Sequence, residues 1–152
     1  MLGLYLDERW DEDRSFKILE SEKYHHKELG HVHVEGLGEI TITWQGKIDG
    51  IWSDPRNGAI AVKDSKTSSH EFEHHGPGGG PGRDAVRYQQ SGQFMGYCFL
   101  TGATSALVDS ITCLKPLQRM TAKSAPRNQF ERIPFEWSPE QISEWQHRTL
   151  FQ

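Results

Sequence analysis

Apolar and polar residues alternate along residues 39–52, and this alternation restricts the fold more than any other feature of the sequence. The apolar side chains at even positions are Ile40, Ile42, Trp44 and Ile48. Because successive side chains of a β-strand point to opposite faces, this spacing predicts a strand with one buried face. Pro, Asn and Gly then occupy turn positions at 54–58, and residues 59–66 return as a second strand. Residues 39–66 are therefore predicted to form a β-hairpin.

The remaining segments predict an alternation of strands and helices. Strands are expected at 16–29, 106–114 and 129–137, helices at 84–100 and from 138 onward, a helical tail at 2–16, and a turn or strand edge at "HVHVEGLG" (31–38). The final helix has a cap signature, because Ser138 is followed by Pro139 and, three residues after the cap, by Gln141. This order predicts an α/β domain whose central mixed sheet is flanked by helices.

Length and composition restrict the class of protein. The 152 residues fit a single domain, 1–152, and the net charge of −4 means that any binding of nucleic acid must depend on a local site. No apolar run approaches the roughly 20 residues of a membrane span, and the acidic start lacks the basic region of a signal peptide, so we expect a cytoplasmic protein. Cys98 and Cys113 lack C-x-x-C spacing and are expected to be buried thiols. The segment 68–83, rich in Gly, Pro and His, is expected to be a flexible loop.

Two acids and a lysine lie on the predicted hairpin. Asp64 and Lys66 are two residues apart on one strand, so their side chains share a face, and Asp49 can project onto it from the neighbouring strand. Close carboxylates repel unless a cation lies between them, and their oxygen atoms, with the backbone carbonyl of Ser65, suit Mg²⁺ or Mn²⁺. A lysine beside the metal can orient or activate a water for attack on a phosphodiester. The alternative is a solvated hairpin edge with ordinary charges.

The predicted helix that follows offers uncharged hydrogen-bonding groups. Gln93 and Tyr97 are four residues apart and share a helical face, with Gln89 one turn earlier and Arg87 close by. Such side chains can hold a phosphate backbone or a base, and Arg83 and Arg87 are candidates for phosphate contacts. The alternative is an amphipathic helix whose apolar side packs the core while Gln93 faces water.

Three motifs together resemble a known family. They are G-x-x-D at 46–49, D-x-K-T at 64–67 and Q-x-x-x-Y at 93–97, in the order strand, strand, helix. This pattern resembles the RecB-like branch of the PD-(D/E)XK nuclease superfamily. The resemblance implies a restriction-endonuclease-like core in which Asp49 and Asp64 are metal ligands, Lys66 is the catalytic lysine, and Gln93 with Tyr97 faces the substrate. The leading helix of the family, which bears a histidine or glutamate ligand, has no recognisable counterpart before Phe16.

The resemblance implies a metal-dependent DNA nuclease, with an exonuclease of recombination, repair or phage DNA processing favoured. Implied partners are DNA, helicase or recombination proteins, or the rest of a longer parent chain. Two alternatives remain: a catalytically degenerate nuclease fold that binds DNA or a protein, and an α/β domain with coincidental motifs. The histidine pairs at 31/33 and 74/75 lie on different segments and are expected to be surface residues rather than a zinc site.

Overall fold

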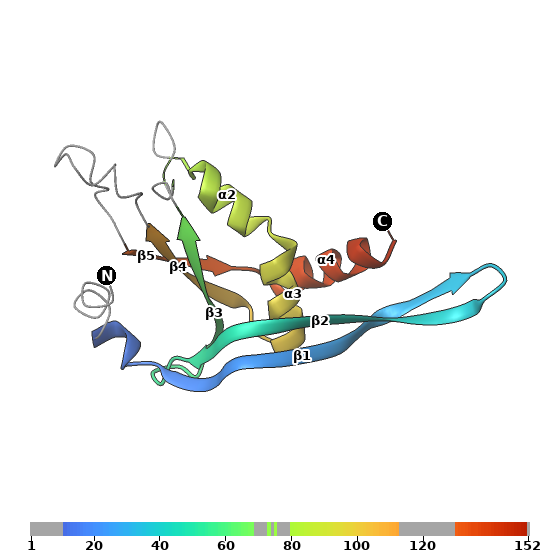
Figure 1. Cartoon of the computed structure of the whole chain (residues 1–152), viewed down its shortest axis with the longest axis horizontal. Helices are drawn as coiled ribbons and strands as arrows, with labels where there is room; N and C mark the ends of the chain where they lie inside the picture. Colours follow the sequence, from blue (N-terminus) through green and yellow to red (C-terminus); the bar gives the residue numbers. More distant parts are fainter. Residues whose placement is uncertain (1–10, 69–72, 74, 76–79, 113–129, 152) are drawn as a thin grey trace.

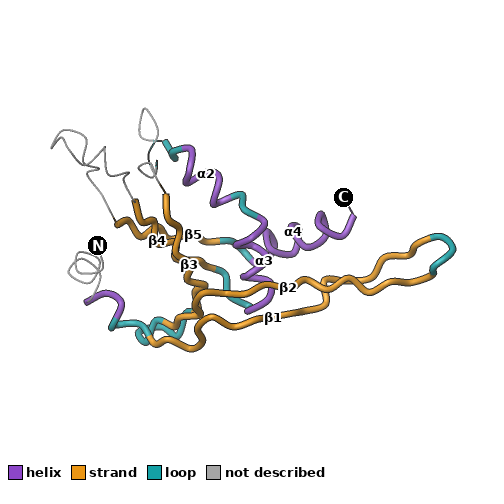
Figure 2. Tube along the Cα trace, in the orientation of Figure 1, coloured by secondary structure: helices purple, strands orange, loops and turns teal. Residues whose placement is uncertain are grey.

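The computed structural model describes residues 11–68, 73, 75, 80–112 and 130–151. Its elements are β1 (Lys17–Val34), β2 (Gly38–Ser53), β3 (Ile60–Ser68), α2 (Arg83–Gln89), α3 (Gly92–Thr101), β4 (Ser105–Thr112), β5 (Phe130–Glu136) and α4 (Pro139–Phe151). The strands form one sheet in the order β1-β2-β3-β4-β5, in which β3 and β4 are parallel and the other neighbours are antiparallel. The expected α/β fold with a mixed sheet flanked by helices is confirmed (Figures 1 and 2).

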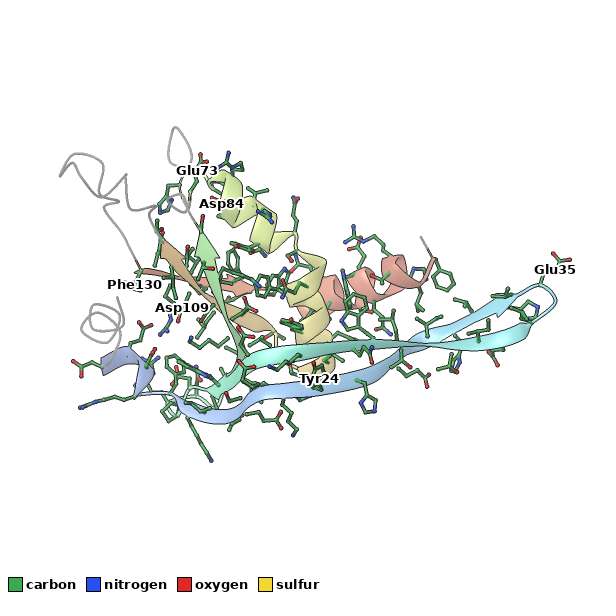
Figure 3. All side chains as sticks on the ribbon, in the orientation of Figure 1. Tyr24, Glu35, Glu73, Asp84, Asp109 and Phe130 are labelled. Carbon is green, nitrogen blue, oxygen red and sulfur yellow. The ribbon has the colours of Figure 1, made fainter. Side chains whose placement is uncertain are left out.

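The antiparallel strands β1 and β2 extend beyond the rest of the sheet as an arm (Figure 1). β2 pairs with β3 only between Gly50 and Ser53, so the earlier part of β2 leaves β3 and continues with β1 alone. Figure 3 shows Glu35 in the turn at the far end of this arm. Residues 31–34, expected as part of a turn or strand edge, are the last residues of β1, and the turn is limited to 35–37.

The turn between β2 and β3 forms as predicted. The backbone N–H of Asp54 donates to the Ala59 carbonyl at 2.9 Å, and that of Gly58 donates to the Asp54 carbonyl at 2.7 Å. Gly58 has a φ of 72°, a left-handed conformation that glycine adopts without steric cost. These bonds fix which residues of β2 and β3 lie opposite one another.

The hydrophobic core lies between the sheet and α3. Its central residues are Val62 of β3, Val108 of β4, Ile133 of β5, and Phe94 and Cys98 of α3. Cys98 is thus a buried thiol, as expected, and burial raises its pKa to about 12. Cys113 lies outside the described residues.

Helix α4 holds the arm against the body. Its Trp145 packs with Phe99 and Leu29 in a second apolar cluster, and the Gln146 side-chain amide donates to the Leu29 carbonyl at 2.6 Å. The predicted cap is confirmed, because the backbone N–H of Ser138 donates to Gln141 Oε1 at 2.8 Å and the backbone N–H of Gln141 donates to Ser138 Oγ at 3.2 Å.

The single helix expected at 84–100 is wrong, because the chain forms two helices separated at Gln90 and Ser91. The backbone of Ser91 is extended, with φ −71° and ψ 120°. The indole N–H of Trp137 donates to the Gln89 carbonyl at 3.0 Å. A continuous helix would need this carbonyl to accept the N–H of Gln93. A side chain that follows β5 therefore occupies the acceptor at which the helix breaks.

Two other sequence expectations fall largely outside the described residues. Of the helical tail expected at 2–16, the structure shows a helical turn at 11–13. Of the loop expected at 68–83, it shows His75 in an isolated bridge with Pro81. Glu73 of this loop donates its backbone N–H to the carboxylate of Asp84, the second residue of α2, at 3.0 Å (Figure 3). No helix in the described ranges is long and apolar enough to cross a membrane.

Candidate metal and catalytic site

Asp49 and Asp64 lie where β2 and β3 separate, a place called the fork below. The last paired residues on this side are Gly50 and Lys63, so each acid is the next residue along its strand. Asp49 Oδ2 accepts the backbone N–H of Ser65 at 3.4 Å. The structure therefore brings the two carboxylates and Ser65 together at the fork.

Asp64 is a buried carboxylate beside a partly exposed cation. Its side chain is 4% exposed and that of Lys66 is 29% exposed. Burial raises the pKa of Asp64, the Lys66 ammonium 2.7 Å from Asp64 Oδ2 opposes the rise, and the Asp49 charge adds to it. Within the described residues, the Lys66 ammonium is the group that pairs with the buried Asp64 Oδ2. A further cation near this oxygen would stabilise the ionised acid.

A line of polar contacts leads from Asp64 to α3. Lys66 Nζ donates to Gln93 Oε1 at 3.4 Å, and Gln93 Nε2 donates to the Tyr97 hydroxyl at 3.0 Å. Lys66 Nζ also lies 5.7 Å from the centre of the Phe94 ring, within cation–π range. Lys66, Gln93 and Tyr97 therefore form one connected line that starts at the buried carboxylate.

Two glycines allow α3 to lie directly on β2 just before Asp49. A Cβ atom on Gly46 would lie 2.9 Å from Tyr97 Cε1, and one on Gly96 would overlap the indole of Trp44. Gly46 is the glycine of the G-x-x-D motif, three residues before Asp49. The motif therefore combines an acid with the space that the Tyr97 ring needs.

Gln89, which the unbroken helix would place beside this line, lies elsewhere. Gln89 belongs to α2, and its Nε2 donates to the Glu136 carbonyl at 3.0 Å at the end of β5. The break at 90–91 removes the helical alignment with Gln93 on which the expectation depended. Arg87 is exposed, with its guanidinium 6.0 Å from the centre of the Tyr88 ring, and Arg83 lies 3.7 Å from the Glu73 carboxylate.

Tyr88 is a neighbour of the site that helical spacing does not reveal. It is five residues before Gln93, which in one continuous helix is off the Gln93–Tyr97 face. Its ring packs edge-on to Phe94, with centroids 5.7 Å apart. Burial raises the pKa of Tyr88 and the charge of Lys66 lowers it, so the phenol lies within electrostatic range of the lysine.

The donors at the fork fit a hard divalent cation. Two carboxylates and the Ser65 carbonyl are ligands that Mg²⁺ and Mn²⁺ accept, and the Asp64 carboxylate is buried with the Lys66 ammonium as its cationic partner. Across the described ranges, no three or more His, Cys, Asp or Glu side chains gather to hold a metal ion. The candidate set is therefore two side chains and a carbonyl. Of the histidines, His31 lies 2.8 Å from Glu28 on the arm, and His74 is outside the described residues.

Comparison with known proteins identifies no family for the chain, so a function is proposed from the geometry of the fork. No family model matches the chain, and no curated protein matches it. Among solved structures the chain is similar to one described as "Crystal structure of SSO0001", with a TM-score of 0.48 and 15% sequence identity. The similarity covers 98% of this chain and 55% of that chain, so this chain spans about half the length of that neighbour.

Proposed function

We propose that the chain is a metal-dependent DNA nuclease with a restriction-endonuclease-like core, similar to the RecB-like branch of the PD-(D/E)XK superfamily. The supporting observation is the line from the two fork acids through Lys66 and Gln93 to Tyr97. These residues come from three short motifs that are far apart in sequence, on β2, β3 and α3. Coincidental motifs on a different fold would have no reason to form one connected site.

The residues divide the work of phosphodiester hydrolysis by their chemistry. Asp49, Asp64 and the Ser65 carbonyl would hold the ion. When bound, Mg²⁺ or Mn²⁺ supplies Lewis acidity toward a phosphoryl oxygen and lowers the pKa of a bound water. The Lys66 ammonium cannot be a metal ligand while it is protonated, so its role is to orient the attacking water and to stabilise charge on the phosphate.

Gln93 and Tyr97 present uncharged hydrogen-bonding groups to the DNA backbone. Contacts of this kind position a nucleic acid without bulk positive charge, which suits a chain with a net charge of −4. The proposal includes an exonuclease of recombination, repair or phage DNA processing in the cytoplasm. Helicase or recombination proteins, or the rest of a longer parent chain, would be its partners.

A second candidate is a catalytically degenerate nuclease fold that binds DNA or a protein. One observation favours it: no third acidic or histidine side chain joins the two carboxylates within the described residues. Such a protein would keep the shape of the fork but would lack enough ligands to hold the ion during turnover. The active nuclease is expected to cut the DNA that it binds, whereas the degenerate fold is expected to bind without cutting.

Single-turnover cleavage of labelled single- and double-stranded DNA in Mg²⁺ and Mn²⁺ tests the proposal. Lys66→Ala is expected to lower the rate by about 10²- to 10³-fold, the range for loss of a preorganised group that stabilises developing charge, with DNA binding retained. Lys23→Ala is the matched control, since Lys23 is an exposed lysine of β1 that pairs with Glu20 at 2.7 Å. Wild-type protein that binds without cutting would favour the degenerate fold, and protein that does neither would end the nuclease proposal.

A further inference from the structure

Behind the fork, on the opposite face of β3, three charged side chains form a buried cross-strand row. Lys63 Nζ lies 2.8 Å from Asp109 Oδ2, and Arg132 donates to both oxygens of the same carboxylate, at 2.7 and 2.8 Å. The side chains of Lys63, Asp109 and Arg132 are 13%, 4% and 3% exposed. Figure 3 shows Asp109 among side chains on the side of the sheet toward the N-terminal turn. These groups are not used by the proposed mechanism.

Strand register places Ser65 next to this row, on the same face of β3 as Lys63. Ser65 lies beside Asp109 across the β3–β4 pair, and Asp109 lies opposite Arg132 across the β4–β5 pair. Lys63 Nζ donates to Ser65 Oγ at 3.4 Å, while the Ser65 backbone N–H donates to Asp49 on the site side. Ser65 therefore connects the buried row to the acids of the fork.

Contacts on its other sides also restrict the row. The Trp52 ring centre lies 4.9 Å from Lys63 Nζ and 5.4 Å from Arg132 Cζ. Arg132 Nη1 lies 2.6 Å from Asp13 Oδ1 of the N-terminal helical turn. A buried ion group held by this many neighbours keeps a defined geometry, and removal of one member changes the charge balance of the others.

We propose that Lys63 is a positioning residue of the fork and that Asp109 and Arg132 hold its ammonium in place. From the far face of β3, Lys63 fixes Ser65, and through Ser65 it fixes the spacing of Asp49 and Asp64. Groups that orient metal ligands in this way are part of a metal site, although they do not contact the ion. This inference rests on the proposed function, because it assigns Lys63 to the same metal site.

Removal of the Lys63 charge has two possible effects on metal affinity, and they have opposite signs. Lys63 is a cation close to a cation site, so by Coulomb interaction alone its loss would tighten Mn²⁺ binding. Loss of a group that orients the ligands weakens binding instead, typically by about 10- to 100-fold. A merely structural role would lower stability and leave the affinity of the folded protein unchanged. Weaker Mn²⁺ binding therefore indicates a positioning role, tighter binding a Coulomb effect, and unchanged affinity a merely structural role.

The experiment is calorimetric titration of the full chain with Mn²⁺ in the absence of DNA. Lys63→Met is expected to weaken Mn²⁺ binding by about 10- to 100-fold, and Lys63→Arg is expected to restore most of it, because a guanidinium still pairs with Asp109. Ile133→Val is the control, since it removes a buried methyl group from the helix side of the sheet and is expected to keep wild-type affinity. Unchanged or tighter binding by folded Lys63→Met overturns the proposal.

A second readout separates this inference from the proposed function. Hydrogen exchange of the amides of residues 64–66 in metal-free protein is expected to be faster in Lys63→Met than in Ile133→Val. If the wild type binds no Mn²⁺ but exchange at 64–66 is faster in Lys63→Met, the proposed metal site is wrong while the positioning of β3 by Lys63 is supported. If the wild type binds no Mn²⁺ and exchange is unchanged in Lys63→Met, both the metal site and the positioning role are wrong. If Lys63→Met does not fold, Ser65→Ala is measured instead, because it removes only the hydroxyl contact with Lys63. Weaker Mn²⁺ binding by Ser65→Ala supports the proposal, and wild-type affinity overturns it.

Discussion

Replacement of Asp64 by Asn is expected to stabilise the metal-free protein, although Asp64 is one of its least exposed side chains. Burial raises the pKa of this carboxyl and the Asp49 charge adds to the rise, so the ionised acid is less favourable in the folded chain than in the unfolded chain. Asn has nearly the same shape without the charge. Lys66, at 29% exposure, keeps access to water and its bond to Gln93 when the carboxylate is gone.

The converse change, Lys66→Met, is expected to destabilise the protein. Met retains apolar contact near Phe94 but leaves the Asp64 side chain, 4% exposed, without its cation. A buried polar group left unpaired costs about 1–3 kcal/mol. For a chain of 152 residues, each kcal/mol corresponds to about 2–4 °C in Tm. The Tm of Lys66→Met is therefore expected to fall by about 2–12 °C, whereas that of Asp64→Asn rises.

The advantage of Asp64→Asn is expected to depend on pH. In the wild type, the stability associated with protonated Asp64 is fully present below the unfolded pKa of 3.8 and is lost as pH rises through the raised folded pKa. The two proteins should therefore differ most at neutral pH and converge in acid. Scanning calorimetry in EDTA from acid to neutral pH measures this difference. A neutral-pH Tm of Asp64→Asn below that of the wild type would refute the claim that burial makes the ionised Asp64 carboxylate unfavourable in the folded chain.

Divalent metal should reverse the order of the two proteins. At about 100 times its Kd, Mn²⁺ stabilises a protein with an intact site by about 2.7 kcal/mol, which is about 5–11 °C for a chain of this size. Asp64→Asn lacks one of the two carboxylates and is expected to gain much less. An equal shift in both proteins would place the bound Mn²⁺ away from the fork.

Three further perturbations test the packing and the polar contacts. Gly96→Ala places a Cβ against a β2 indole and is expected to cost about 1–3 kcal/mol by urea unfolding; an unchanged midpoint would contradict the close approach of α3. Gln93→Ala should weaken DNA binding by about 0.5–1.5 kcal/mol in fluorescence anisotropy with Ca²⁺, and a matching loss of Mn²⁺ affinity would refute its role on the substrate side. Burial raises the pKa of Asp109, but hydrogen bonds from Arg132 and Lys63 outweigh it and lower the pKa. The destabilisation by Asp109→Asn should therefore be complete above the unfolded pKa of 3.8 and disappear as pH falls through the folded value, so a pH-independent difference would count against the buried row.

The two strands and the turn of the expected hairpin could be predicted because their determinants are local, but the hairpin pairs only at 50–53 with 60–63, and the rest of 39–52 pairs with β1 instead. Alternation at 39–52, a turn with Pro, Asn and Gly, and an apolar run at 59–62 need no distant partner. The length of the arm was missed for a related reason: Gly30 follows a register shift in β1 and interrupts the apolar pattern before Val32 and Val34 resume it. The fork also depends on tertiary pairing, since beyond Gly50 and Lys63 β2 continues beside β1 and β3 continues beside β4.

The helix break and the buried row depend on residues that are distant in sequence. The break depends on Trp137, which reaches the Gln89 carbonyl across 48 residues. The row joins Lys63 to Asp109 and Arg132, each of which looks like an ordinary strand charge when its own segment is considered alone. The three motifs, in contrast, identified the Asp64–Lys66–Gln93–Tyr97 line, because each motif lies within one element and its internal spacing is set by that element.

Single-turnover DNA cleavage by Asp64→Asn in Mn²⁺ tests the proposed nuclease most directly, because the same substitution is expected to stabilise the fold. Loss of activity can then not be attributed to unfolding. The expected result is a protein that melts above the wild type in EDTA and cuts neither single- nor double-stranded DNA above the metal-free background, while the wild type cuts at least one of them. A folded Asp64→Asn protein that cuts at the wild-type rate would contradict the proposal, since the buried carboxylate at the fork would then not hold the metal.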